Sequence, residues 1–283
     1  MVDFYKRAWK KQFESILTQT KNELIITSPY IKTTEAELIC NNFLNRRISD
    51  KIHFTLLTDL KAQSILDCSL DIDALQLFQS RITNFELITL PRLHAKVYIF
   101  DGKYAVVGSS NLTTSGLEFN YEYNIGLDDK RSVQKIQSDI SDYSVLGNRI
   151  EKSQLDELTT IATGIQCEYQ KVTNSTTREV QRKFRETIKN ANTKFIEAFV
   201  GKKSAYSIFK ETIVYCLSRE SLSTKELQTK VQQMLPDLCI DEELIINGQK
   251  FGKRWKHQVR TVLNDLRRRE NLSSENKIWH LKK

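Results

Sequence analysis

The chain has 283 residues, of which 40% are apolar and 28% are charged, with 9 Gly and 3 Pro. This length suffices for about two domains of ~100–200 residues, and the composition excludes a collagen-like, low-complexity or wholly disordered chain. No run approaches the ~18 consecutive apolar residues of a membrane-spanning helix, and the N-terminus lacks the apolar core of a secretory signal. We therefore expect a cytoplasmic protein with no membrane partner.

Charge separates the two halves of the chain. Residues 1–150 carry 18 Lys/Arg and 18 Asp/Glu, whereas residues 151–283 carry 25 Lys/Arg and 17 Asp/Glu, so the whole excess of +8 lies in the second half. Such asymmetry favours a domain that meets a polyanion beside a domain with another task. A basic solvated surface with no partner is the alternative.

Cysteine usage argues against cross-links and metal. The five cysteines form no Cys-x-x-Cys pair and are odd in number: Cys40, Cys68, Cys167, Cys216 and Cys239. This pattern excludes a disulfide framework and a structural zinc site, and it predicts reduced, mostly buried thiols. We expect no metal and no cofactor.

Strand-like runs alternate with helical stretches through residues 1–150. The expected strands are 24–28, 52–58, 85–90, 94–100, 104–107 and 122–127. The expected helices are 34–47 and 71–81. This alternation predicts an α/β domain in which helices cover both faces of a sheet.

The chain from about 129 to 200 is predicted to be helical, with 151–200 as a connector. One apolar stripe repeats at helical spacing through Val180, Phe184, Ile188, Ala191, Phe195 and Phe199. The polar stretch 171–177 is predicted to be a loop, and 201–204 is the expected linker to the next domain.

Residues 201–283 are predicted to form a compact unit of three helices and a short sheet. A first helix runs through Ile208–Leu217, and Ser223 with Glu226 forms a capping box that opens the second. An irregular insertion is expected at 236–252, a third helix at 253–270, then a turn and a strand at 277–281.

The chemistry is concentrated at 94–122. His94, Lys96 and Asp101 form H-x-K-x4-D, Gly108-Ser109-Ser110-Asn111 forms G-S-x-N, and Glu122 follows. In a strand, positions i and i+2 face the same side, so we expect the imidazole and the ammonium to point at one place. A second His-x-Lys at His280 has no following Asp and is interpreted as chance.

This composite motif resembles the signature of the phospholipase D superfamily, and the Ser-Pro-Tyr at 28–30 is also typical of that fold. The resemblance implies a phospholipase D-like mixed β-sheet flanked by helices. It implies that His94 attacks phosphorus and forms a covalent phosphohistidine. It further implies that Lys96 and Asn111 stabilise the charge that develops on the phosphoryl oxygens.

The remaining members of the predicted catalytic set have supporting roles. Glu122 is the candidate carboxylate that holds the His94 Nδ1–H, and Ser109 is expected to support the site by hydrogen bonding. Asp101 is expected to anchor the strand and its turn rather than to touch substrate. No metal is needed, because cationic side chains supply the electrostatic stabilisation.

A single motif copy predicts an assembly. The reaction needs a second His to protonate the leaving oxygen and then to activate water, and family members take it from a second copy of the motif. His53 and His257 lack the surrounding pattern. We therefore expect a homodimer whose two-fold axis brings two copies of His94 into one composite site. An inactive half-site is the weaker alternative.

The third helix of the C-terminal unit carries a basic face opposite its apolar stripe. With the following turn and strand it resembles a winged-helix module, in which this helix would enter the major groove of double-stranded DNA and the loop 271–276 would form the wing. The predicted DNA-binding residues are Lys253, Lys256, His257, Arg260, Asn264, Arg267 and Arg268. Trp255 and Trp279 are assigned to the core. The alternative is a solvated helix end favoured by the helix dipole.

The sequence thus predicts a metal-independent DNA endonuclease with a catalytic domain at 1–150 and a winged-helix-like domain at 201–283. The architecture resembles the phospholipase D-like restriction endonucleases, which implies a type II restriction enzyme, and a companion methyltransferase fits that hypothesis. Alternatives are a nonspecific or structure-specific DNA or RNA nuclease, a lipid phosphodiesterase, and a DNA-binding protein with an inactive site. The intact motif residues argue against the last.

Overall fold

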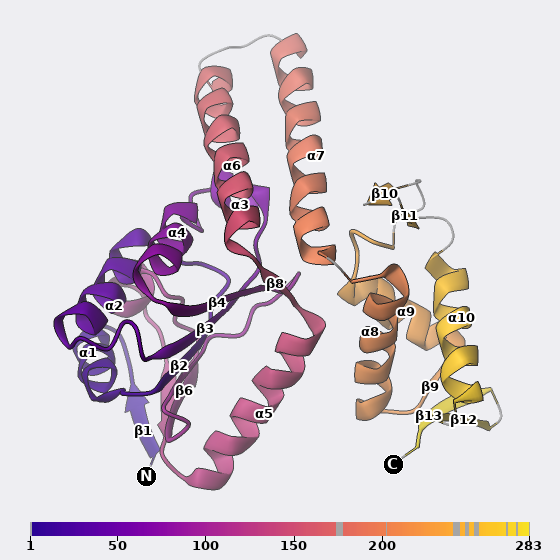
Figure 1. The fold of residues 1–283 in the computed structure, drawn as a ribbon, viewed down its shortest axis with the longest axis horizontal. Coiled ribbons are helices and arrows are strands. Elements are labelled where there is room, and N and C mark those ends of the chain that lie inside the picture. The colour runs from indigo at the N-terminus through magenta and orange to yellow at the C-terminus, as the bar shows by residue number, and fades with distance from the viewer. Residues whose placement is uncertain are drawn as a thin grey trace. The chain divides into compact units, whose positions relative to one another are not determined.

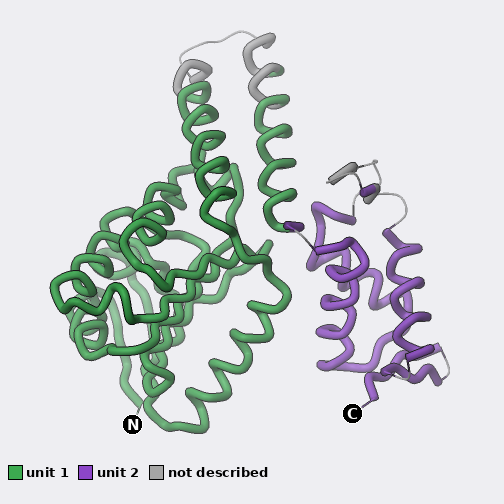
Figure 2. Tube along the Cα trace, in the orientation of Figure 1, with its two compact units in different colours: residues 1–199 green, residues 200–283 purple. Residues whose placement is uncertain are grey.

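The computed structural model describes residues 2–173, 178–201, 203–239, 244–246, 249–251, 255–269, 271–275 and 277–282. The chain divides into two compact units, residues 1–199 and residues 200–283 (Figure 2). Each unit is described by itself.

Unit 1 is built on one mixed sheet of eight strands in the order β1-β7-β6-β5-β2-β3-β4-β8. Only the pairs β2–β3 and β3–β4 are parallel; the other neighbours are antiparallel. The strands are β1 Val2–Tyr5, β2 Glu23–Thr27, β3 His53–Thr58, β4 Asn84–Thr89, β5 Val97–Phe100, β6 Tyr104–Gly108, β7 Asn124–Leu127 and β8 Asn148–Ile150. The predicted α/β fold with a mixed sheet is confirmed.

Helices cover both faces of this sheet (Figure 1). On one face, α1, α2 and α4 pack on alternate strand residues such as Leu24 and Phe54. On the other face, α5 packs Val133 and Ile140 against Ile99 and its neighbours. The helices of this part are α1 Lys10–Gln19, α2 Thr33–Asn45, α3 Ala62–Leu66, α4 Ile72–Arg81, the π-helical turn η1 Ser115–Phe119 and α5 Lys130–Leu146.

The six predicted strands and two predicted helices are confirmed within a few residues at their ends. The sequence missed the two edge strands, β1 and β8, which are short and lack a periodic apolar pattern. It also began β5 three residues too early, since the strand starts at Val97. The reason is local: the Val97 N–H donates to the Thr27 Oγ1 (3.0 Å), so the residues before it lie outside the ladder.

Two long helices, α6 Lys152–Thr173 and α7 Arg178–Val200, follow β8. Leu155 and Leu158 of α6 and Phe195 of α7 join the core that lies under α2 and α4. The loop predicted at 171–177 is wrong at its start, because α6 continues to Thr173; residues 174–177 lie outside the described residues. The apolar stripe is buried at Ala191, Phe195 and Phe199, while the side chains of Val180 and Phe184 are outside the described part.

The described residues of unit 2 form three helices and two small sheets. Its helices are α8 Ala205–Arg219, α9 Thr224–Met234 and α10 Trp255–Arg268. One sheet has the order β12-β13-β9 and the other pairs β10 with β11. Their strands are β9 Leu222–Ser223, β10 Leu244–Ile246, β11 Gln249–Phe251, β12 Leu272–Glu275 and β13 Ile278–Leu281.

Several local predictions for unit 2 are confirmed. Ser223 and Glu226 form a reciprocal capping box at the start of α9. Trp255 and Trp279 are buried. The prediction of a loop at 271–276 is wrong, because residues 272–275 form β12 and pair with β13. Three of the five cysteines, Cys40, Cys216 and Cys239, are buried; Cys68 and Cys167 are exposed. Searched over its described residues, the chain has no helix both long and apolar enough to cross a bilayer.

Candidate active site

His94 and Lys96 lie in an extended segment directly before β5. The backbone carbonyl of Lys96 accepts the Gly108 N–H of β6 (3.2 Å), which fixes this segment beside the end of the neighbouring strand. The Lys96 Nζ lies 3.1 Å from His94 Nδ1 and 3.2 Å from His94 Nε2, and it donates to the His94 carbonyl (2.8 Å). The two side chains therefore meet, although they are not within a strand.

The environment of Lys96 lowers the pKa of its ammonium group. Its side chain is buried, with 7% of the residue exposed, whereas His94 is exposed. Burial lowers the pKa of Lys96, and the negative charge of Glu122 opposes that shift. A desolvated cation next to an exposed imidazole can stabilise negative charge on a phosphoryl group far better than a solvated one.

Glu122 is held by its own neighbours. The Ser109 hydroxyl donates a short hydrogen bond to Glu122 Oε2, and the Asn120 side-chain amide donates to Oε1 (3.1 Å). The Ser109 Oγ also accepts the Tyr123 N–H (3.1 Å). None of the hydrogen bonds found among the described residues joins Glu122 to His94, the partner that the sequence analysis expected. Within one chain, the carboxylate instead faces the Lys96 charge.

Asn111 carries an unsatisfied acceptor. Its Oδ1 is buried and has no hydrogen-bond partner among the described residues. Its backbone carbonyl accepts the Thr113 N–H (2.8 Å) at the start of the loop that leads into η1. A buried amide oxygen without a partner is costly, and such groups concentrate at functional sites. The predicted role of Asn111 at a phosphoryl oxygen would use the Nδ2 donor of the same carboxamide, since an amide oxygen is an acceptor.

The loop that carries Asn111 is fixed by a buried polar network that the sequence did not reveal. Asn124 Oδ1 accepts the Ser110 N–H (3.2 Å) and its Nδ2 donates to the Ser110 Oγ (2.8 Å). Trp9 Nε1 donates to the same Oγ (3.0 Å), and the Tyr98 hydroxyl donates to the Ser110 carbonyl (2.8 Å). Gly108 is required beside it, because an added Cβ would lie 2.1 Å from Asn124 Oδ1.

A buried carboxyl group lies behind this loop. Glu35, in the first turn of α2, is fully buried; its Oε1 accepts the Thr114 hydroxyl (2.7 Å), and its Oε2 has no partner among the described residues. Burial raises the pKa of Glu35, against the opposing effects of the Thr114 hydrogen bond and of Lys10. Sequence reasoning missed Glu35, because nothing local distinguishes it from other acidic residues near a helix start.

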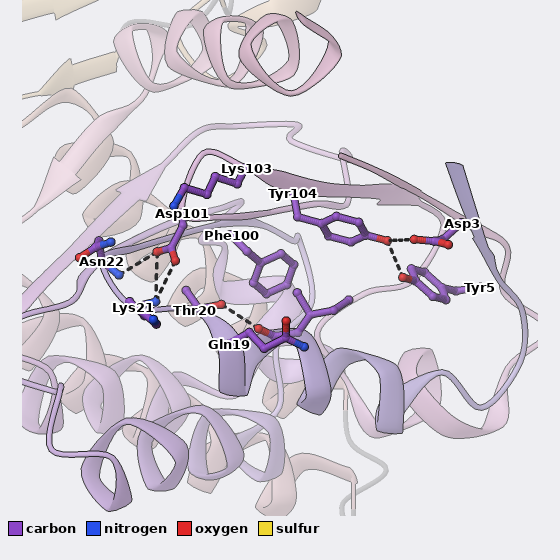
Figure 3. A pocket seen from close by; sticks show the side chains of 11 residues that line it. Asp3, Tyr5, Gln19, Thr20, Lys21, Asn22, Phe100, Asp101, Lys103 and Tyr104 are labelled. Carbon is purple, nitrogen blue, oxygen red and sulfur yellow. Dashed lines mark hydrogen bonds between the residues drawn. The ribbon is translucent and has the colours of Figure 1, made fainter. Parts of the chain in front are cut away.

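Asp101 lies at the opposite end of β5 from Lys96. Its carboxylate accepts the backbone N–H groups of Lys21, Asn22 and Glu23, at distances between 2.7 and 3.1 Å. Figure 3 shows the bonds from Lys21 and Asn22. It also borders a pocket of about 470 Å³ at that end of the strand. The position is that of an anchor between β2 and the β5–β6 turn, remote from the reacting atoms.

The same pocket is closed on one side by a polar cluster under β7. The Tyr104 hydroxyl donates to Asp3 Oδ2 (2.7 Å) and makes a short hydrogen bond with the Tyr5 hydroxyl (Figure 3). Gly126 leaves the space for it, since an added Cβ would lie 2.0 Å from the Tyr104 Oη. The cluster ties the edge strand β1 to the sheet.

The predicted DNA-binding residues of α10 share one exposed face. These residues are Lys256, His257, Arg260, Asn264, Arg267 and Arg268. The opposite face is buried through Trp255, Val259, Val262 and Leu266, as the spacing predicted. Arg267 also lies over the Trp279 ring, with its guanidinium carbon 6.0 Å from the ring centre. Lys253 lies outside the described residues.

Comparisons with known proteins agree with this fold. Residues 13–143 match the family model described as cardiolipin synthase, PLD-like domain. Among curated proteins, no significant match is found.

Solved structures with similarity to the chain include NucT from Helicobacter pylori (16% identity, TM-score 0.40, covering 50% of this chain and 94% of that one). The phospholipase D family member Nuc from Salmonella typhimurium gives 14% identity and a TM-score of 0.45, covering 54% and 99%. Phosphatidylserine synthase from Haemophilus influenzae Rd KW20 gives 15% and 0.46, covering 61% and 44%. Structural similarity at these identities and TM-scores does not indicate the activity of this chain.

Proposed function

We propose that this chain is a metal-independent phosphodiesterase that cleaves DNA, with His94 as the nucleophile. The observation that carries the proposal is the meeting of an exposed imidazole with the buried Lys96 ammonium, beside the loop that presents Asn111. An imidazole can attack phosphorus, and fixed donors beside it can stabilise the pentacovalent transition state.

The reaction proceeds in two displacements. In the first, His94 Nε2 forms a bond to phosphorus while the bond from phosphorus to the leaving oxygen breaks, and a second imidazole gives that oxygen a proton. In the second, the same imidazole takes a proton from water, the water oxygen attacks phosphorus and the phosphorus–nitrogen bond breaks. Lys96 and the carboxamide of Asn111 bind the non-bridging oxygens in both steps.

The second imidazole comes from a second copy of the chain. A row of large side chains with more than a third of their surface exposed supports this homodimer: Val2 51%, Phe4 59%, Tyr123 53% and Ile125 37%. The strand registers pair Phe4 with Ile125 and Ile125 with Val107, so these side chains lie on one face of the sheet at its β1 edge. An apolar face of this kind on a soluble domain is typical of an interface.

Unit 2 is the DNA-binding part of the proposal. The exposed basic face of α10, the neighbouring helices α8 and α9 and the sheet β12-β13-β9 support a winged-helix-like reader. A dimeric nuclease with such a DNA-binding domain leads to the most specific form of the proposal, a type II restriction endonuclease that cleaves double-stranded DNA. A companion methyltransferase belongs to this form of the proposal. A nonspecific nuclease is the second form, because basic residues alone give affinity without sequence preference.

The test is cleavage of a plasmid of known sequence in excess EDTA, with His94→Ala as the inactive variant. His53→Ala is the matched control, since His53 is an exposed histidine of the same unit on β3. Discrete bands that disappear only in His94→Ala support the restriction form, and a smear supports the nonspecific form. Intact DNA in EDTA that is cut when Mg²⁺ is restored overturns the phosphohistidine mechanism.

The dimer has its own test. Wild-type chains are mixed with an excess of His94→Ala chains, and the cleavage rate per wild-type chain is measured. A composite site predicts that the cleavage rate per wild-type chain falls in proportion to the loss of wild-type homodimers. Separately, Phe4→Glu should be inactive, and light scattering should show that it is a monomer. An unchanged rate per wild-type chain contradicts the shared site.

A further inference from the structure

A pocket of about 220 Å³ opens beside the proposed nucleophile. His94 forms part of its wall, with Tyr30, Asp59, Lys61, Ser64 and Arg92. Pockets that enclose whole drug-sized ligands measure ~300–1,000 Å³, so this one suits a single ring system rather than a complete nucleotide or a lipid chain. Because His94 lines the pocket, a group next to a phosphate at His94 lies within reach of it.

The lining of the pocket has the chemistry of a nucleobase site. Tyr30 contributes an aromatic ring with 37% of the residue exposed, and stacking on an aromatic ring serves every base. Asp59 is nearly fully buried, with 6% exposed; it accepts the Arg92 N–H (2.9 Å) and forms a short ion pair with Lys61. With the Ser64 hydroxyl, these groups offer both donors and acceptors to the edge of a base.

The charge around the mouth favours the strand that carries the base. Lys61 and Arg92 line the pocket with His94, and the single carboxylate among the lining residues, Asp59, is paired with Lys61. Two cations at the rim attract the phosphates on either side of the scissile bond. An uncharged or cationic ligand would gain nothing from them.

The aromatic wall is held in register with the catalytic loop. The Ser28 hydroxyl donates to the Tyr30 carbonyl (2.7 Å) and accepts the Leu112 N–H (3.0 Å), and Leu112 directly follows Asn111. The Thr58 hydroxyl reaches the Pro29 carbonyl from β3 (3.5 Å). The Ser-Pro-Tyr segment is therefore fixed relative to the site, which lowers the entropy lost when a base binds.

We propose that this pocket receives the nucleobase adjacent to the scissile phosphate, and that the base must be unpaired to enter it. The inference rests on the proposed nuclease function. A base inside a duplex is stacked and paired, so it has to leave the helix before it can meet Tyr30, and this step is easiest at a mismatch or in a single strand. The substrate class is thus DNA in which one nucleotide at the cut is unpaired or readily extruded.

The test uses oligonucleotides that carry a mapped cleavage position, with and without the flanking base replaced by an abasic sugar. For the wild-type enzyme, removal of that base should lower kcat/KM by about 5- to 150-fold, the range that stacking one base on an aromatic ring supplies. Tyr30→Ala should show a similar loss on the normal strand and no further loss on the abasic strand. Tyr30→Phe should retain activity. Tyr169→Ala, which removes a tyrosine of comparable exposure (41%) on α6, is the matched control.

Two further arms complete the design. A mismatch at the flanking position of a duplex should be cut faster than the matched duplex, by at least about tenfold. The same strands are also bound to His94→Ala protein, which reports the pocket without catalysis. Additive losses from Tyr30→Ala and the abasic sugar, or equal cleavage of matched and mismatched duplexes, overturn the inference. If the wild-type enzyme cleaves none of the strands while His94→Ala protein still binds the strand with the base selectively, the proposed function is overturned and the pocket assignment is not.

Discussion

Removal of the Asp101 carboxylate should destabilise unit 1 and leave the chemistry at His94 intact. The side chain accepts hydrogen bonds from three consecutive backbone N–H groups, at Lys21, Asn22 and Glu23, of which Figure 3 shows the first two. Hydrogen bonds to a charged acceptor contribute ~1.5–3 kcal/mol each, but two of these donors are on exposed residues that water can satisfy after the change. We therefore expect Asp101→Ala to lower the free energy of unfolding by about 2–4 kcal/mol.

Asp101→Asn separates charge from hydrogen bonding. The amide keeps one acceptor oxygen with the right shape, so only the charge assistance is lost, and the expected cost falls to about 1–2 kcal/mol. Burial alone would raise the pKa of Asp101, but the three N–H groups outweigh it and lower the pKa. A lowered pKa means that this stability is present above the ordinary aspartate value and is lost as pH falls through the lowered one.

The assay is urea denaturation of both variants, followed at neutral pH and again near pH 3, with kcat/KM measured on the folded protein. For a unit of ~200 residues, a loss of about 3 kcal/mol corresponds to a decrease in Tm of ~6–12 °C. A variant that unfolds like the wild type but loses catalysis would refute the reasoning, because it would place Asp101 among the groups that act on the substrate. The difference between wild type and Asp101→Asn should be smaller near pH 3 than at neutral pH, because part of the carboxylate's contribution is lost below the ordinary aspartate value.

Four other changes probe the site, its support and the second unit. Lys96→Met keeps the buried stem but removes the ammonium 3.1 Å from the His94 ring, so kcat/KM should fall by about 10²–10³ with Tm retained; a loss under tenfold would remove Lys96 from the mechanism. Burial raises the pKa of Glu35, so the stability of the wild type should fall as pH rises through that raised value. Urea midpoints measured from pH 4 to 8 should show this fall for the wild type but not for Glu35→Gln. Parallel pH profiles of the two proteins would contradict a buried charge at Glu35. Phe209→Ala empties a fully buried position of α8 and should cost ~3–5 kcal/mol, seen by calorimetry as a lower transition for unit 2 alone. Lys256→Ala should weaken DNA binding equally for all sequences and reduce the slope of log K against log salt by about 1; an altered sequence preference would place Lys256 at a base edge instead.

The sequence by itself determined most strands and helices of the sheet domain and the meeting of His94 with Lys96. Strand residues alternate with period two and α10 repeats its apolar residues at helical spacing, and both patterns depend only on near neighbours in the chain. The motif residues are also close in sequence, so His94 and Lys96 could be paired before any fold was known. The capping box at Ser223 is local in the same sense.

The tertiary structure decided which groups surround that motif. The donors to Asp101 lie about 80 residues away in sequence. Ser110 is reached by Asn124 from β7 and by Trp9 from the position just before α1. The burial of Glu35 and the exposure of Tyr30 depend on which faces neighbouring elements cover. The periodicity of apolar residues shows which face of a helix or strand is buried, but not which other element packs against that face. Strand pairing and register depend on contacts between residues far apart in the chain, which no local pattern encodes.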